Sequence, residues 1–170
     1  MSNETTTETG LIIETLEAGT GETPSVGDRV LVHYEIWVGD GATSSQYNEE
    51  TATYENTIYD STYDEDNPFS GPIEIVIGQP TPKDEVYTVG DSIKGLDEAL
   101  LTMKIGGKRG LLIPPDLGYG ALGASSFHSF HGYRHPPEVP IRCNIELVEI
   151  KSAPNLKEET PDSGPAHEAV

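Results

Sequence analysis

The sequence predicts an α+β fold, in which an antiparallel β-sheet packs against one short α-helix. Apolar and polar residues alternate through Arg29–Val38, which is the period of a strand with one buried face. The segment Ile73–Ile77 repeats this period with isoleucine just before a glycine. An apolar stripe at i, i+3, i+4 and i+7, the spacing of one helix face, is formed by Leu96, Ala99, Leu100 and Met103. A short helix on an antiparallel sheet makes a two-layer domain.

The other strands follow from similar patterns. We expect them at Leu11–Leu16, Lys108–Ile113 and Val139–Ile150, which are apolar or alternating runs set between turn residues. On the 29–38 strand, the residues expected to share the inward face are Val30, Val32, Tyr34, Ile36 and Val38.

The predicted helix has matching end signals. Asp97 and Glu98 fall in its first turn and Lys104 falls near its end, in keeping with the helix dipole. The pair Gly106-Gly107 is expected to end it.

The 170 residues suit a single domain. Residues 1–10 are polar and rich in Thr and Glu, so we expect a disordered arm there. Residues 11–152 would form the domain, and residues 153–170 a flexible tail. The polar segments Gly39–Thr57 and Gln79–Thr88 are expected to be long loops, which usually carry function or are mobile.

The charge balance limits the partners. A formal net charge of −19 repels nucleic-acid phosphates and anionic lipids, so neither nucleic acid nor membrane is expected as a partner. Such a surface suits either basic clients or a salt-rich environment, in which ions screen the repulsion. An ordinary acidic surface explains the charge equally well.

The expected location is the cytoplasm. The chain has no apolar run long enough to span a membrane, and its N-terminus lacks the basic and apolar regions of a secretory signal. The single cysteine, Cys143, excludes an internal disulfide. It lies in an apolar alternating run, so a small buried hydrophobic residue is the favoured interpretation.

Three motifs carry a resemblance to a known family. The longest is Val89–Gly120, VGDSIKGLDEALLTMKIGGKRGLLIPPDLGYG, and the others are Tyr59-Asp60-Ser61-Thr62 and Asn67-Pro68-Phe69. From Leu11 to Lys151 the chain resembles the FKBP-type peptidyl-prolyl cis-trans isomerases. The resemblance implies a strongly curved sheet wrapped around the helix, with a ligand pocket between them.

The implied reaction is rotation about X-Pro bonds in folding proteins. Its barrier of roughly 18–20 kcal/mol arises from amide resonance, and a catalyst has only to bind the twisted amide better than the planar one. An apolar aromatic pocket with one or two hydrogen bonds meets that need, so no cofactor, metal or nucleophile is expected. Proline-containing peptides and unfolded proteins would be the partners of a monomeric enzyme.

The resemblance assigns the site residues. Asp60 and Tyr119 would be catalytic and orient the substrate, and Ile93 would offer its backbone N–H to a substrate carbonyl. The other expected binding residues are Tyr34, Tyr59, Phe69, Leu96 and Cys143. From the residues alone other interpretations stay open: Tyr34 and Phe69 as plain core, Asp60 in an Asx-type turn, and Tyr119 packed on a glycine turn.

Two positions depart from the family pattern. Leu96 stands where many members have tryptophan, and Cys143 stands where phenylalanine is usual. Less apolar wall lowers binding energy by about 25 cal/mol per Å², so reduced affinity for FK506-like macrolides is expected. The long segment Ala121–His135 would rebuild the rim with three aromatic residues, Phe127, Phe130 and Tyr133.

Metal binding is the weaker interpretation of two clusters. The spacing of His128, His131 and His135 would align them as zinc ligands only on a helix, and Gly132 and Pro136 argue against a helix there. The acids Asp60, Asp64, Glu65 and Asp66 lack the pattern of a calcium loop, so a solvated acidic rim is favoured. The main alternative to the isomerase is a non-catalytic protein-binding or chaperone module on the same fold.

Overall fold

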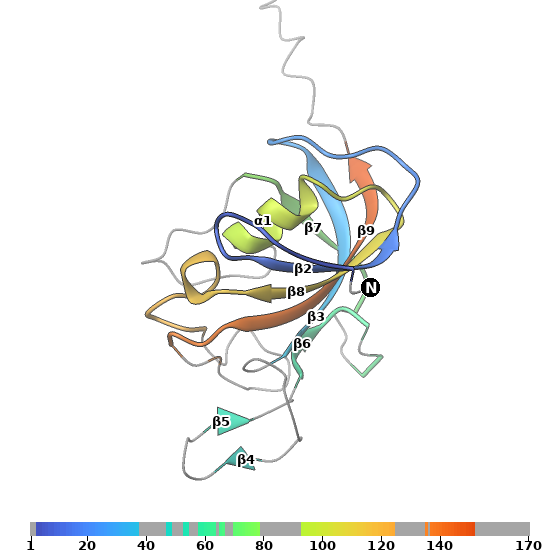
Figure 1. The fold of residues 1–170 in the computed structure, drawn as a ribbon. Coiled ribbons are helices and arrows are strands. Elements are labelled where there is room, and N and C mark those ends of the chain that lie inside the picture. Colours follow the sequence, from blue (N-terminus) through green and yellow to red (C-terminus); the bar gives the residue numbers. More distant parts are fainter. Residues whose placement is uncertain are drawn as a thin grey trace, which may run out of the picture.

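A computed structural model describes residues 3–37, 47–48, 53–54, 58–63, 65–66, 70–78, 93–124, 135 and 137–151. Within them, a seven-stranded antiparallel sheet wraps around one helix, α1 (Lys94–Leu100) (Figure 1). Its strands are β1 (Glu4–Thr6), β2 (Ile12–Ala18), β3 (Arg29–Trp37), β6 (Ile58–Ser61), β7 (Ile73–Val76), β8 (Gly107–Ile113) and β9 (Ile141–Lys151). A separate backbone ladder joins β4 (Tyr47–Asn48) and β5 (Thr53–Tyr54), and the 3₁₀ helix η1 (Pro115–Leu117) follows β8. The predicted fold class is confirmed.

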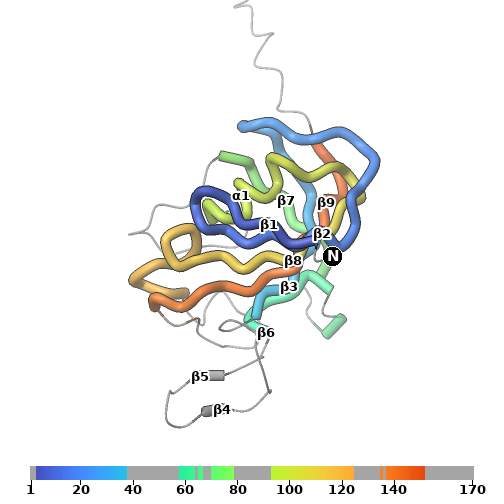
Figure 2. Tube along the Cα trace, viewed as in Figure 1, coloured from blue at the N-terminus to red at the C-terminus, as the bar shows by residue number. Residues whose placement is uncertain are grey.

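Strand β3 organises the sheet. It pairs with β9 along its whole length, from Arg29 opposite Lys151 to Trp37 opposite Arg142. Its other edge is shared by β7 at the start and β6 at the end. The strand order is β1-β2-β8-β9-β3-β6, and Figure 2 shows β8 and β9 running side by side. Register shifts interrupt the β2–β8, β3–β6 and β3–β9 ladders, and a shift of this kind bends a sheet locally.

The core lies between the sheet and α1. The four residues of the predicted helix stripe, Leu96, Ala99, Leu100 and Met103, are all buried, but Met103 lies beyond the end of α1. The predicted helix end at Gly106-Gly107 is therefore wrong. The inward face of β3 is confirmed: Val30, Val32 and Ile36 are buried and Tyr34 packs against them, whereas Val38 lies outside the described residues. Cys143 is fully buried, as a small hydrophobic residue would be.

Helix α1 ends earlier than its dipole signals predict. It stops at Leu100, so Lys104 falls beyond its last turn. The cation at the helix end is instead Arg109, on β8. Its guanidinium donates to the carbonyl oxygens of Ala99 and Thr102, at 2.8 Å each. The helix C-terminus is therefore stabilised by a side chain of the following strand, β8.

The N-terminal arm also differs from the expectation of disorder. Glu4, Thr5 and Thr6 pair with Glu14, Ile13 and Ile12 as strand β1. Threonine suits a strand, and the ladder satisfies backbone groups along the outer edge of β2. Composition alone gave no sign of this pairing. The other proposed boundaries, at residues 11 and 152, stay predictions.

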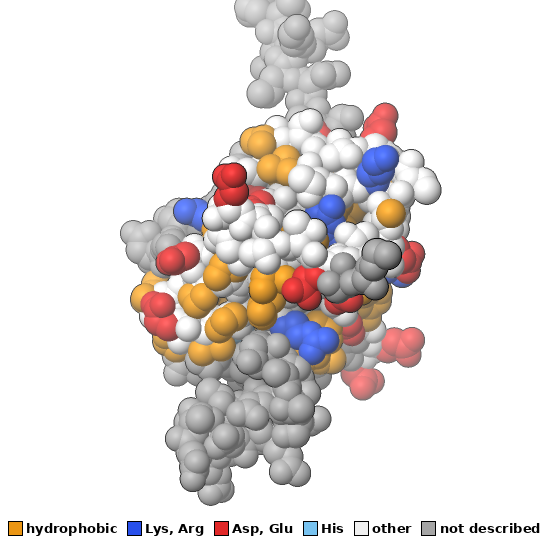
Figure 3. Space-filling model, viewed as in Figure 1, with side chains coloured by type: hydrophobic (Ala, Val, Ile, Leu, Met, Phe, Trp, Pro, Cys, Tyr) orange, Lys and Arg blue, Asp and Glu red, His pale blue; other side chains and the backbone are white. Residues whose placement is uncertain are grey.

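The surface is rich in carboxylates. On the face drawn in Figure 3, acidic side chains are scattered around the rim and basic ones lie in a few places between them. No helix among the described residues is both long enough and apolar enough to cross a membrane.

Candidate functional site

The site begins with a hydrogen bond between neighbouring strands. Tyr34, on β3, donates its hydroxyl hydrogen to Asp60 Oδ2, on β6, at 2.5 Å. The second carboxylate oxygen of Asp60 accepts the backbone N–H of Ser61 at 3.0 Å. Burial, and then the nearby Asp60 carboxylate, raise the pKa of the Tyr34 phenol far above its ordinary value. The phenol therefore stays protonated and holds the carboxylate in place.

Thr62 fixes the end of β6 against β3. Its Oγ1 accepts the backbone N–H of Tyr34 at 2.9 Å and lies 2.9 Å from His33 Nδ1. Its own N–H donates to the Tyr34 carbonyl at 3.0 Å. In the motif Tyr59-Asp60-Ser61-Thr62, the first three residues, Asp60 included, therefore belong to strand β6. Thr62 holds the end of that strand against β3.

Two tyrosines and a histidine form an aromatic cluster. The ring centroids of Tyr59 and Tyr119 lie 6.1 Å apart at 57°. His135 meets both edge-on, at 6.2 Å from Tyr59 and 5.2 Å from Tyr119. These distances suit tilted aromatic contacts, which add to burial. Tyr59, Tyr119 and His135 are all buried.

Electrostatic coupling connects this cluster to Tyr34 and Asp60. Burial raises the pKa of the Tyr119 phenol well above its ordinary value, and nearby groups add to the shift: Tyr59, Tyr34, Cys143 and Asp60. The pKa of Tyr59 is raised by burial first and by Asp60 second. Tyr34, Tyr59, Asp60, Tyr119 and Cys143 therefore lie close enough to influence one another electrostatically.

The rest of the described site belongs to the same core. Ile93 is the N-cap of α1 in an extended conformation, and its carbonyl accepts the N–H groups of Leu96 and Asp97. Its side chain and that of Leu96 are buried in the core cluster that also holds Tyr59, Tyr119 and Cys143. Cys143 lies opposite Ile36 in the β3–β9 ladder.

Several predicted residues lie outside the described part of the chain. Phe69, Phe127, Phe130 and Tyr133 are among them, as are His128, His131 and Asp64. Glu65 and Asp66 are exposed. Among the described residues, no group of three or more His, Cys, Asp or Glu is placed to hold a metal ion.

His135 is the site residue that the sequence analysis missed. Its sequence context suggests only a role as a zinc ligand, whereas the structure buries it against Tyr59 and Tyr119. A bridge of two 3.0 Å backbone hydrogen bonds to Ala124 holds it there. This bridge joins two residues of the 121–135 segment, and no local sequence pattern around His135 predicts it.

These groups combine one carboxylate, Asp60, with three tyrosine hydroxyls and a buried thiol. The raised pKa values keep the phenols protonated well into the alkaline range. Burial raises the pKa of the Cys143 thiol as well, and a protonated buried thiol is a poor nucleophile. The described site is therefore suited to binding and orienting a substrate.

Known proteins share this architecture. The sequence profile described as FKBP-type peptidyl-prolyl cis-trans isomerase matches residues 20–148. An "FK506-binding protein" of Neisseria meningitidis is 34% identical over 141 residues, which cover 83% of this chain and 96% of that protein. The "FKBP-type peptidyl-prolyl cis-trans isomerase FkpA" of Escherichia coli is 30% identical over 149 residues, or 88% of this chain and 41% of that one.

Solved structures agree. A crystal structure of a peptidyl-prolyl cis-trans isomerase from Pseudomonas syringae pv. tomato superposes with a TM-score of 0.57 at 25% identity, covering 88% of this chain and 82% of that one. The crystal structure of AtFKBP13 gives a TM-score of 0.59 at 26% identity, covering 87% and 98%. The chain therefore belongs to the FKBP-type peptidyl-prolyl cis-trans isomerase family.

Proposed function

We propose that the volume around Tyr34, Tyr59, Asp60 and Tyr119 is where this peptidyl-prolyl cis-trans isomerase rotates the X-Pro bonds of folding proteins. The observation that carries the proposal is the Tyr34–Asp60 hydrogen bond beside the Tyr59–Tyr119–His135 cluster. It places a fixed, partly buried carboxylate beside buried aromatic rings.

The mechanism follows from the amide. Resonance holds the X-Pro bond planar and gives it a barrier of roughly 18–20 kcal/mol. The planar amide is more polar than the twisted one, so a buried aromatic pocket favours the twisted form. Only an interaction that is stronger in the twisted state accelerates the rotation. The described residues supply such an environment without a cofactor.

The polar groups would orient the chain. The Tyr119 hydroxyl and the Ile93 backbone N–H would bind substrate carbonyls, each contributing on the order of 1 kcal/mol net. Asp60 would orient the prolyl amide from the other side, with its direction fixed by Tyr34 and Ser61. Leu96, Cys143 and Phe69 would complete the apolar enclosure, and Phe127, Phe130 and Tyr133 its rim.

Macrolide binding is a finer proposal on the same site. Some relatives are named for FK506 binding, and we propose weaker binding here, because Leu96 and Cys143 offer less apolar wall than the aromatic residues they replace. In a calorimetric titration, Leu96→Trp should raise FK506 affinity by about tenfold if it adds about 55 Å² of apolar contact. If the folded variant showed no gain in FK506 affinity, residue 96 would not belong to the wall of the binding site.

The rotation assay tests the site. Isomerisation of a short X-Pro peptide, coupled to an isomer-specific protease, should slow about fivefold in Tyr119→Phe and in Asp60→Asn, the loss expected for one hydrogen bond of about 1 kcal/mol. Asp28→Asn is the matched control, since Asp28 binds a backbone N–H in the Ser25–Asp28 turn at the other end of β3.

Each outcome has one meaning. Full activity in both site variants would refute the assignment of the site. A wild-type chain that binds proline peptides without rotating them would favour the non-catalytic binding or chaperone module. The monomeric state, unfolded-protein clients and cytoplasmic location stay predictions.

A further inference from the structure

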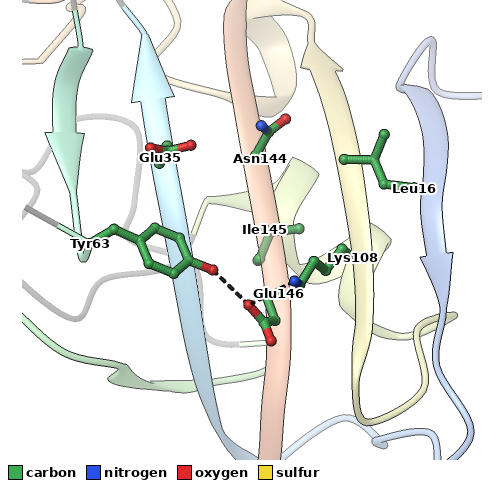
Figure 4. A pocket seen from close by; sticks show the side chains of 7 residues that line it. All are labelled: Leu16, Glu35, Tyr63, Lys108, Asn144, Ile145 and Glu146. Carbon is green, nitrogen blue, oxygen red and sulfur yellow. Dashed lines mark hydrogen bonds and ion pairs between the residues drawn. The ribbon is translucent and has the colours of Figure 1, made fainter.

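A hollow lies on the sheet, apart from the aromatic cluster. It has a volume of about 310 Å³ and is lined by Leu16, Glu35, Tyr63, Lys108, Asn144, Ile145 and Glu146. Figure 4 shows these side chains coming from the neighbouring strands β3, β9, β8 and β2 and from Tyr63, just after β6. We call it the outer-face groove, because successive strand residues point to opposite faces. Tyr34 and Ile145 face the core, so Glu35, Asn144 and Glu146 face outward.

The strand register explains the hollow. Glu35 on β3, Asn144 on β9 and Gly110 on β8 stand opposite one another in one row. Gly110 presents no side chain in that row. A Cβ at this position would lie 3.4 Å from the Glu14 carboxylate and 3.5 Å from Asn144 Oδ1. The glycine therefore adds no side chain to the row between Glu14 and Asn144, next to the groove.

Tyr63 builds an aromatic wall. Its ring stacks on His33 with a centroid distance of 4.5 Å and an angle of 19°. Its hydroxyl donates to Glu146 Oε2 at 2.7 Å, reaching across β3 to β9 (Figure 4). Tyr63 remains 45% exposed, and Leu16, 49% exposed, stands on the far side of the groove. The groove thus has one aromatic and one aliphatic wall.

The groove carries an excess of negative charge. Among the described residues that line it, the one cation is Lys108, which is paired with Glu17 at 3.1 Å and lies 3.8 Å from Glu146. Within the described part of the chain, Glu35 makes no side-chain hydrogen bond or ion pair. Burial raises the pKa of the Tyr63 phenol, with Glu146, Glu35 and Glu17 adding to the shift. A cation that enters the groove would therefore pair with the Glu35 carboxylate without displacing an existing partner.

We propose that the outer-face groove binds the side chain of an arginine in a basic polypeptide partner. A guanidinium can stack on an aromatic ring and form paired hydrogen bonds to a carboxylate, and Tyr63 and Glu35 offer these two surfaces together. Its aliphatic stem would pack on Leu16. The net charge of −19 would steer basic chains toward the protein. This site is independent of the prolyl site on the other face.

The test is an NMR titration of the full ¹⁵N-labelled chain with Nα-acetyl-arginine methylamide. We expect saturable amide shifts at Glu35, Tyr63, Asn144 and Glu146. The citrulline analogue, which has the same shape and no charge, should produce none. Glu35→Gln should weaken binding about threefold to fivefold, the range of a partly exposed ion pair. Glu149→Gln is the matched control: it removes the same charge from an exposed position of β9 outside the groove, and it should change binding less than twofold.

A second variant separates the wall from the charge. Tyr63→Leu keeps an apolar side chain and removes the ring, so it should weaken binding of the arginine ligand. Nα-acetyl-lysine methylamide, which carries the charge without a planar guanidinium, should bind the wild-type chain more weakly than the arginine ligand. Tyr63→Leu should leave its affinity unchanged. Shifts scattered over the acidic surface would overturn the proposal, as would equal losses in Glu35→Gln and Glu149→Gln. Equal affinity for lysine and arginine would overturn the assignment to a guanidinium. Shifts centred on Tyr59 and Tyr119 would place the ligand in the prolyl site instead.

Discussion

The hydroxyl group of Tyr34 and the carboxylate of Asp60 are 2.5 Å apart, and their hydrogen bond joins β3 to β6 on the inner face of the sheet. One interaction therefore sets both the orientation of an aromatic wall and the direction of the acid beside it. Disturbing either residue disturbs the other.

Tyr34→Phe keeps the ring and removes this bond. Because hydrogen bonds to charged groups contribute about 1.5–3 kcal/mol and Tyr34 is partly exposed, we expect the free energy of unfolding to fall by about 1–2 kcal/mol. Urea denaturation measures it. Tyr63→Phe removes the more exposed bond to Glu146 and should cost less. If the two losses were equal, burial at Tyr34 would not strengthen the bond.

Arg109→Met tests the end of α1. The guanidinium donates to the Ala99 carbonyl, the Thr102 carbonyl and the Thr102 hydroxyl, with distances from 2.6 to 2.8 Å. Methionine keeps most of the stem and leaves these carbonyls without that donor, so we expect a loss of about 2 kcal/mol. Thermal denaturation is the measurement. Arg29→Met breaks only an exposed ion pair with Glu74 and should shift the melting temperature less; an equal shift would contradict the capping role.

Gly95→Ala sets helix propensity against packing. Alanine favours a helix over glycine by about 1 kcal/mol, but a Cβ at Gly95 would lie 2.5 Å from Ile113 Cγ2. Overpacking costs about 1–3 kcal/mol, so we expect net destabilisation in urea. Lys94→Ala, at the exposed neighbouring position, should change stability little. A more stable Gly95→Ala protein would show that α1 can move away from β8.

Alkaline pH should destabilise the fold above about pH 10. Tyr34, Tyr59 and Tyr119 have pKa values raised in the folded chain above that of an unfolded tyrosine. Their contribution is complete below the unfolded pKa of about 10 and is lost as pH rises toward the folded pKa, by about 1.4 kcal/mol per unit for each phenol.

The measurement is unfolding free energy between pH 8 and 11, with phenolate absorbance recorded in parallel. In Tyr59→Phe the decline above pH 10 should be shallower. Native-state titration of all tyrosines near pH 10 would contradict the burial of these three.

Local patterns predicted much of the fold. The period of two in β3 and the helix stripe from Leu96 to Met103 are set by neighbouring residues, and burial follows both. What local patterns do not show is how the elements pack on one another. Arg109, rather than Lys104, contacts the helix end because β8 folds back beside α1. Strand β1 forms because β2 offers it an edge.

The candidate site likewise contains residues that sequence motifs predict and one that they do not. Tyr34, Tyr59, Asp60 and Tyr119 were chosen from motifs of the resemblance, and the structure places them together. His135 is held beside Tyr59 and Tyr119 by its bridge to Ala124, which a sequence pattern cannot show. The outer-face groove likewise needs strand register, since His33, Tyr63 and Glu146 are far apart in the chain.

The most direct test of the prolyl site is an NMR titration of the ¹⁵N-labelled chain with a short X-Pro peptide whose isomers are both observed. We predict amide shifts centred on Tyr59, Asp60, Ile93 and Tyr119, with exchange between the bound cis and trans peptide that slows in Tyr119→Phe. Shifts centred on Glu35 and Tyr63 instead, with exchange unchanged by Tyr119→Phe, would contradict the account.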